Sequence, residues 1–98
     1  MKSLAAFKRH IKPGQKWHAY HHLPGKDLGV REVAKVNSVG FYLYTVKTDG
    51  TIGQSFMDFP KSDLIEFNDD GSVTIFWPAS VMYDQPRRAV VTYKQVHE

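Results

Sequence analysis

Apolar side chains near the start of the chain recur at the spacing of a helix face. Leu4, Phe7 and Ile11 are three and four residues apart, and Ser3 stands before them in the position of an N-cap. Pro13-Gly14 then stops the pattern, because proline cannot continue a helix. The sequence therefore predicts a short amphipathic helix that ends near Ile11.

The rest of the chain is predicted to form short strands. Apolar and polar side chains alternate with a period near two, and Gly, Pro, Asn and Asp gather between the alternating segments. The predicted strands are residues 16–22, 30–36, 41–47, 55–59, 64–67, 72–77, 79–83 and 89–96. Residues 23–29 contain one proline and two glycines and are predicted to be an irregular loop.

This order of elements predicts one mainly β domain spanning all 98 residues. We expect a small, strongly bent antiparallel sheet or barrel with a short N-terminal helix. The layout is similar to that of Src-homology-3-like and Sm-like barrels. An open α+β sheet with the helix packed on one face is the alternative.

Trp17 and Trp77 are expected to anchor the core, whereas an exposed tryptophan would be a candidate interface anchor.

Two short stretches carry a second resemblance. Residues 13–17 (Pro-Gly-Gln-Lys-Trp) and residues 58–61 (Asp-Phe-Pro-Lys), together with the small size of the chain, resemble small uncharacterised proteins of bacteriophages and other mobile elements. No role of an individual residue follows from this resemblance.

The hairpin of residues 30–47 gives the most specific site hypothesis. With Ser38-Val39 as the two turn residues, strict alternation divides the hairpin into two faces. The predicted core face consists of Val30, Ala34, Val36, Phe41 and Leu43, interrupted by Glu32 and Thr45. The predicted outer face consists of Arg31, Val33, Lys35, Tyr42, Tyr44 and Val46.

Cations beside tyrosine rings suit single-stranded nucleic acid, because bases stack on the rings while the cations hold the phosphates. The predicted binding residues are Lys16, His18, Tyr20, Arg31, Lys35, Tyr42 and Tyr44. Half-buried aromatic side chains with solvated cations beside them are the alternative interpretation, because aromatics are favoured in strands whatever their function.

The charges of the chain differ between its two halves. Residues 1–47 hold nine Lys and Arg against two acids, a balance of +7, and residues 48–98 hold four against eight, a balance of −4. If the fold kept the halves on different faces, one face would attract polyanions and the other would repel them.

Several classes of protein are disfavoured by composition. The chain has no cysteine, so disulfides, thiolate zinc sites and thiol nucleophiles are excluded. No apolar run approaches the roughly 18 residues of a membrane span, and the N-terminus has no apolar segment of signal-peptide length. We therefore expect a cytoplasmic protein that makes no membrane contact.

We also expect no catalytic site, no cofactor and no metal site. The sequence contains no carboxylate pair, nucleophile with base, or phosphate-binding loop of specific spacing. The cluster of His18, His21 and His22 does not suit one metal ion, because on a strand rising roughly 3.3 Å per residue the side chains diverge.

Together these features predict a non-enzymatic binding module that contacts nucleic acid or a nucleoprotein through its basic, aromatic face. The alternative is a protein-binding inhibitor or adaptor, such as a mobile-element product that blocks a host defence enzyme, since opposite charges steer protein partners. A barrel that binds a small molecule is a third possibility.

Overall fold

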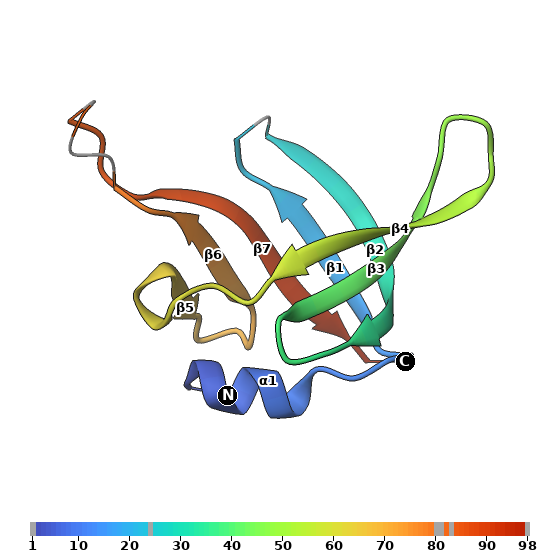
Figure 1. The fold of residues 1–98 in the computed structure, drawn as a ribbon, viewed down its shortest axis with the longest axis horizontal. Coiled ribbons are helices and arrows are strands. Elements are labelled where there is room, and N and C mark those ends of the chain that lie inside the picture. The colour runs from blue at the N-terminus through green and yellow to red at the C-terminus, as the bar shows by residue number, and fades with distance from the viewer. Residues whose placement is uncertain (1, 24, 80–81, 83, 98) are drawn as a thin grey trace.

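The strands form one antiparallel sheet that bends strongly beside a short helix (Figure 1). The computed structural model describes residues 2–23, 25–79, 82 and 84–97. In chain order the elements are α1 (Leu4–His10), β1 (Lys16–His21), β2 (Lys26–Val36), β3 (Gly40–Val46), β4 (Ile52–Asp58), the 3₁₀ turn η1 (Ser62–Leu64), β5 (Ile65–Phe67), β6 (Val73–Trp77) and β7 (Arg88–Val96). The strand order is β4-β3-β2-β1-β7-β6-β5, and β4 does not pair with β5, so the sheet stays open. The predicted mainly β fold with a bent antiparallel sheet is confirmed.

Helix α1 begins where the sequence predicts. The backbone N–H of Ala6 donates to Ser3 Oγ at 3.1 Å, which satisfies one of the free donors of the first turn. The helix ends at His10, one residue before the predicted end. No helix in residues 2–23, 25–79, 82 and 84–97 is long and apolar enough to cross a membrane.

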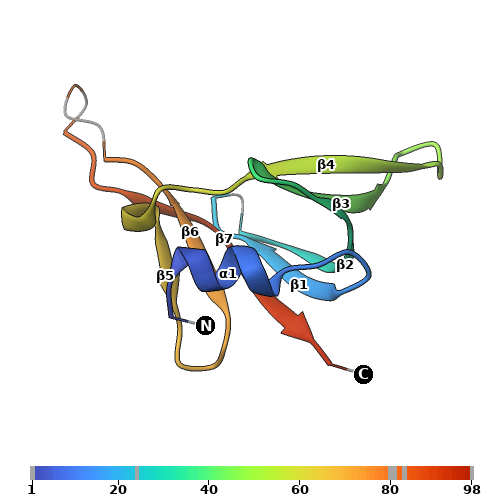
Figure 2. The ribbon, with the colours of Figure 1, turned by 60° about the horizontal axis from the view of Figure 1, so that its bottom comes forward.

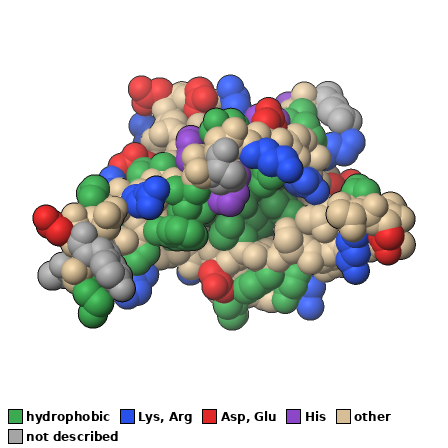
Figure 3. All heavy atoms as spheres, turned by 90° about the horizontal axis from the view of Figure 1, so that it is seen from above, with side chains coloured by type: hydrophobic (Ala, Val, Ile, Leu, Met, Phe, Trp, Pro, Cys, Tyr) green, Lys and Arg blue, Asp and Glu red, His purple; other side chains and the backbone are tan. Residues whose placement is uncertain are grey.

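The core lies between α1 and the concave side of the sheet. Phe7 has no exposed surface and makes edge contacts with the rings of Trp17 and Phe41, at centroid distances of 6.0 and 6.1 Å. Figure 2 shows β3 and β4 as one layer and β1, β7 and β6 as another, joined through β2. At the end opposite α1 the sheet is open, and hydrophobic side chains gather there in a central hollow (Figure 3).

The two tryptophans have different environments. Trp17 is buried, as predicted, whereas Trp77 is 54% exposed. Trp77 lies at the end of β6, after a register shift between Ile75 and Phe76 that carries the strand away from the core. The expectation that Trp77 anchors the core is therefore wrong.

Two strands begin at least three residues earlier than the sequence predicts. Strand β2 begins at Lys26 rather than at Val30, because Gly29 (φ 75°) lies in a bulge inside the strand rather than in a loop. Strand β4 begins at Ile52, directly after the Asp49-Gly50 turn. The predicted strand 79–83 falls mostly outside the described residues.

The two halves of the chain do not form two opposite faces. Strands β1, β2 and β3 of the basic half occupy the middle of the sheet, and strands of the acidic half flank them on both sides. The sequence asymmetry is therefore not carried into two opposite faces, and charges of both signs meet across the sheet, as where Lys94 Nζ of β7 lies 3.6 Å from a carboxylate oxygen of Asp70.

Candidate binding surface

The turn between β2 and β3 is the one that the sequence predicts. The side-chain oxygen of Asn37 accepts hydrogen bonds from the backbone N–H groups of Val39 and Gly40, at 2.9 and 3.0 Å. The first pairs after the turn, Val36 with Phe41 and Lys35 with Tyr42, also match the predicted register. The hairpin is therefore anchored as expected at its closed end.

A bulge then changes the register. Val33 pairs with Leu43, so Ala34 is an extra residue and the predicted pairs of Ala34 with Leu43, Val33 with Tyr44, and Arg31 with Val46 are wrong. Because side chains alternate between faces, a slip of one residue moves every later side chain to the other face. Val33, predicted on the outer face, is 1% exposed, and Val30, predicted in the core, is 53% exposed.

The outer face of strands β3 and β4 carries a row of large side chains. These are Tyr42, Tyr44, Val46, Ile52 and Phe56, which we call the ribbon face. Phe56 is 44% exposed, and Val46 and Ile52 are each 71% exposed. The row is contiguous, because Tyr42 pairs with Phe56 and Val46 pairs with Ile52 across the two strands.

Aromatic and cationic groups meet at one end of the ribbon face. The rings of Tyr42 and Phe56 have centroids 4.8 Å apart at an angle of 41°. Lys35 Nζ lies 5.7 Å from the centroid of the Tyr42 ring, within the range of a cation–π contact. Lys35, Tyr42 and Tyr44 of the predicted site therefore share one surface. The sequence missed Phe56 and Ile52, although the Asp49-Gly50 turn and the alternation after it indicate their register.

The three predicted residues of β1 lie elsewhere on the sheet. Lys16, His18 and Tyr20 have β2 between them and β3. Tyr20 makes an edge contact with the ring of His22 at 5.0 Å, and Lys16 stands opposite Glu32. The fold therefore does not bring Lys16, His18 and Tyr20 to the ribbon face.

The histidines near β1 have separate partners. His18 Nε2 lies 2.8 Å from a carboxylate oxygen of Asp27, and His22 Nε2 lies 2.6 Å from the hydroxyl of Thr92. Among the described residues, no group of three His, Asp or Glu side chains is placed to hold a metal ion.

Asp27 fixes the bulge in β2. Its carboxylate accepts a hydrogen bond from the backbone N–H of Gly29 at 2.7 Å. This bond first, and the hydrogen bond with His18 second, lower the pKa of the Asp27 carboxyl below its ordinary value. The carboxylate therefore stays charged at neutral pH and holds the backbone of residues 27–29 in place.

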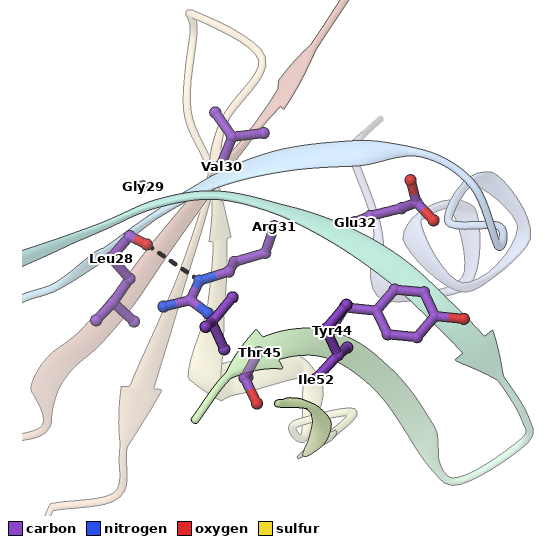
Figure 4. Close-up of a pocket in the computed structure, with 9 residues that line it drawn as sticks. Leu28, Gly29, Val30, Arg31, Glu32, Tyr44, Thr45 and Ile52 are labelled. Carbon is purple, nitrogen blue, oxygen red and sulfur yellow. Dashed lines mark hydrogen bonds between the residues drawn. The ribbon is translucent and has the colours of Figure 1, made fainter. Parts of the chain in front are cut away.

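A cleft opens between β2 and β3 beyond the bulge (Figure 4). Its volume is about 760 Å³. The lining residues are Leu28, Gly29, Val30, Arg31, Glu32, Tyr44, Thr45, Val46 and Ile52. Arg31 points from β2 toward β3, and Glu32 points away from it. The prediction that Arg31 lies on the outer face is wrong, because the bulge at Ala34 turns it inward, but Arg31 and Tyr44 still line one cleft.

The ribbon face and the cleft together form a continuous candidate surface, since Tyr44, Val46 and Ile52 belong to both. Comparisons with protein-family models, with curated proteins and with solved structures find no match to this chain. The resemblance to bacteriophage and mobile-element proteins stays a prediction.

Proposed function

We propose that this chain is a non-enzymatic binding module that contacts a protein partner through the ribbon face. The observation that carries the proposal is the row of exposed apolar and aromatic side chains on β3 and β4. Contiguous exposed apolar patches of this kind mark interaction surfaces, and aromatic side chains supply much of the binding free energy at protein interfaces.

The charges around the ribbon face favour a protein over a polyanion. Lys35 and Asp58 lie at one end, on the same side of the sheet as Phe56, and Arg31 and Glu32 lie at the cleft. These two cations and two acids leave the surface close to neutral. A nucleic-acid site needs several cations to neutralise phosphates, whereas a protein interface needs an apolar centre with a mixed polar rim.

Single-stranded nucleic acid is the second candidate partner. It is favoured by one observation, the contact of Lys35 with the Tyr42 ring beside Phe56. Each base stacked on such a ring would contribute about 1 to 3 kcal/mol. The inward position of Arg31 and the separate position of Lys16 leave few cations near these rings.

A double variant, Tyr44→Ser with Phe56→Ser, tests the proposal. Both side chains are exposed, so we expect the variant to fold, which circular dichroism checks. A protein captured from lysate by the wild-type chain should bind the variant roughly tenfold or more weakly in a direct binding assay. The matched control is Trp77→Ser, which removes an exposed ring from a different strand and should leave the affinity unchanged.

The same variants distinguish the two candidate partners. Oligo(dT) and oligo(U) should bind weakly at physiological salt, with no difference between the variants. Tight, salt-sensitive oligonucleotide binding that the double variant loses would instead support the nucleic-acid candidate. A partner that binds both proteins equally well would place the interaction away from the ribbon face and refute the proposal.

A further inference from the structure

The cleft between β2 and β3 exposes two strand edges inside the sheet. Strand β2 pairs with β3 only through residues 33–36, and its earlier residues pair with β1 alone. From Tyr44 to Val46, β3 pairs with β4 alone. Beyond Glu32 and Tyr44, two backbone edges therefore diverge on either side of one cleft (Figure 4).

Hydrogen bonds near the cleft show which backbone groups face it. The N–H of Val33 donates to the Gln15 carbonyl at 2.8 Å, so Val33 directs its polar groups toward β1. Because these groups alternate along a strand, Val30 and Glu32 direct theirs toward the cleft. Lys47, directly after β3, donates its N–H to the Thr51 carbonyl and so directs its polar groups toward β4. Backbone groups alternate in the same way along β3.

This alternation directs the N–H and C=O groups of Tyr44 and Val46 toward the cleft as well. Such edges bind extended peptides, because an added strand completes the ladder of hydrogen bonds. Val33 directs its groups to β1 and Leu43 directs its groups to β4, so these two partners are a non-hydrogen-bonded pair, and the ladder bonds beside them fall on Glu32 and Tyr44. Val30 and Val46 therefore supply the backbone donors and acceptors that remain on the two sides of the cleft.

Arg31 and Glu32 are the charged residues that line the cleft, and of the two Arg31 is the one that points toward β3 (Figure 4). Its Nε donates to the Leu28 carbonyl at 3.0 Å, which fixes the plane of the guanidinium. In the described part of the chain no carboxylate pairs with Arg31. The terminal nitrogens of the guanidinium are therefore available to bind a carboxylate, and Leu28 and Val46 of the cleft lining add apolar groups.

We infer that this cleft binds an extended peptide segment with an acidic side chain, which adds a strand at the open edge while its carboxylate pairs with Arg31. The inference rests on the proposed function and names the chemistry of the protein partner. A volume of about 760 Å³ holds several side chains rather than a single carboxylate group. A strand also places alternate side chains on opposite faces, so the acid meets Arg31 while its neighbours meet Val30, Tyr44 and Ile52.

A synthetic peptide tests this arrangement on the full chain. The probe is acetyl-Val-Thr-Val-Glu-Val-Thr-Val-amide, and its control carries Gln in place of Glu. Titration followed by ¹⁵N–¹H correlation spectra should shift the amide signals of Val30 and Val46. The Gln peptide should bind about tenfold more weakly, because it loses a charge-assisted pair with Arg31.

Variants of the protein assign the effect to Arg31. Arg31→Met should abolish the preference for Glu over Gln, and Arg31→Lys should retain part of it, because a lysine keeps the charge but loses the planar fork. Arg9→Met, which removes a guanidinium from α1, should behave like the wild type. The comparison of the two peptides on the wild-type chain does not depend on how well the variants fold.

Three results would overturn the inference. These are equal binding of the Glu and Gln peptides, an absence of shifts at the cleft amides, and tight Arg31-dependent binding of octanoate when the peptide does not bind. The outcome is separable from the proposed function, because Phe56 lies outside the cleft lining. If Phe56→Ser weakens partner binding while Arg31→Met does not, the ribbon face remains the interface and only the cleft inference fails.

Discussion

Phe7 is the side chain on which the attachment of α1 depends. It is the one fully buried residue of that helix, and its ring makes edge contacts with Trp17, Phe41 and Phe59 at centroid distances of 6.0, 6.1 and 6.0 Å. A helix of seven residues is not stable alone in water, so its order comes from this packing. Phe7→Ala should therefore leave a cavity between α1 and the sheet and weaken the attachment of the helix.

The expected loss of stability follows from the burial and the ring contacts. Replacing a fully buried Phe by Ala costs about 3 to 5 kcal/mol, which includes the lost transfer free energy and the cavity. A domain of this size has a free energy of unfolding of about 5 to 15 kcal/mol, so a loss of about 4 kcal/mol lowers the melting temperature by roughly 15 to 30 °C. Urea unfolding followed by tryptophan fluorescence, with a parallel thermal melt, measures both quantities.

The matched control is Arg9→Ala in the same helix. Arg9 is exposed, so its replacement should change the free energy of unfolding by no more than about 0.5 kcal/mol. If Phe7→Ala costs less than about 1 kcal/mol, or no more than Arg9→Ala, then the ring does not hold α1 against the sheet and the reasoning fails.

Two further predictions concern the core and the ribbon. Burial raises the pKa of Tyr93 to about 12, so its neutral form stabilises the fold fully below pH 10, and roughly 3 kcal/mol should be lost as the pH rises toward 12. Denaturant unfolding between about pH 10 and pH 12 should show this loss of stability, and Tyr93→Phe should remove the pH dependence. An ultraviolet titration in which every tyrosine of the folded protein ionises near pH 10 would contradict the prediction. Gly40→Ala should cost about 1 to 3 kcal/mol, because its new methyl group would lie 2.2 Å from the Met57 carbonyl oxygen. Gly53→Ala is its control, since the nearest atom to its new methyl group belongs to the flexible Lys47 side chain. If the two variants lost the same free energy of unfolding, the close approach of β3 to β4 would not be the reason for glycine at position 40.

Local signals in the sequence determined the elements and their turns. Ser3 caps the helix, Phe7 follows it at helical spacing, and Asn37 closes the first hairpin with its side chain, each through contacts within four residues. The period of two identified Lys35 and Tyr42 as neighbours next to that turn. These features depend on nearby residues alone, and for that reason they could be predicted.

Tertiary structure decided which side chains share a surface. The bulge at Ala34 has no signature in the alternation, yet it moves Val33 into the core and Arg31 into the cleft. A bulge forms where a sheet must bend to cover its core, so it depends on contacts between distant strands rather than on local preference. The pairing of β1 with β7 is of the same kind, since it joins residues 16–21 to residues 91–96. The sequence by itself thus determined the strands and their turns, while long-range packing decided their register, the opening between β2 and β3, and with it the composition of the candidate site.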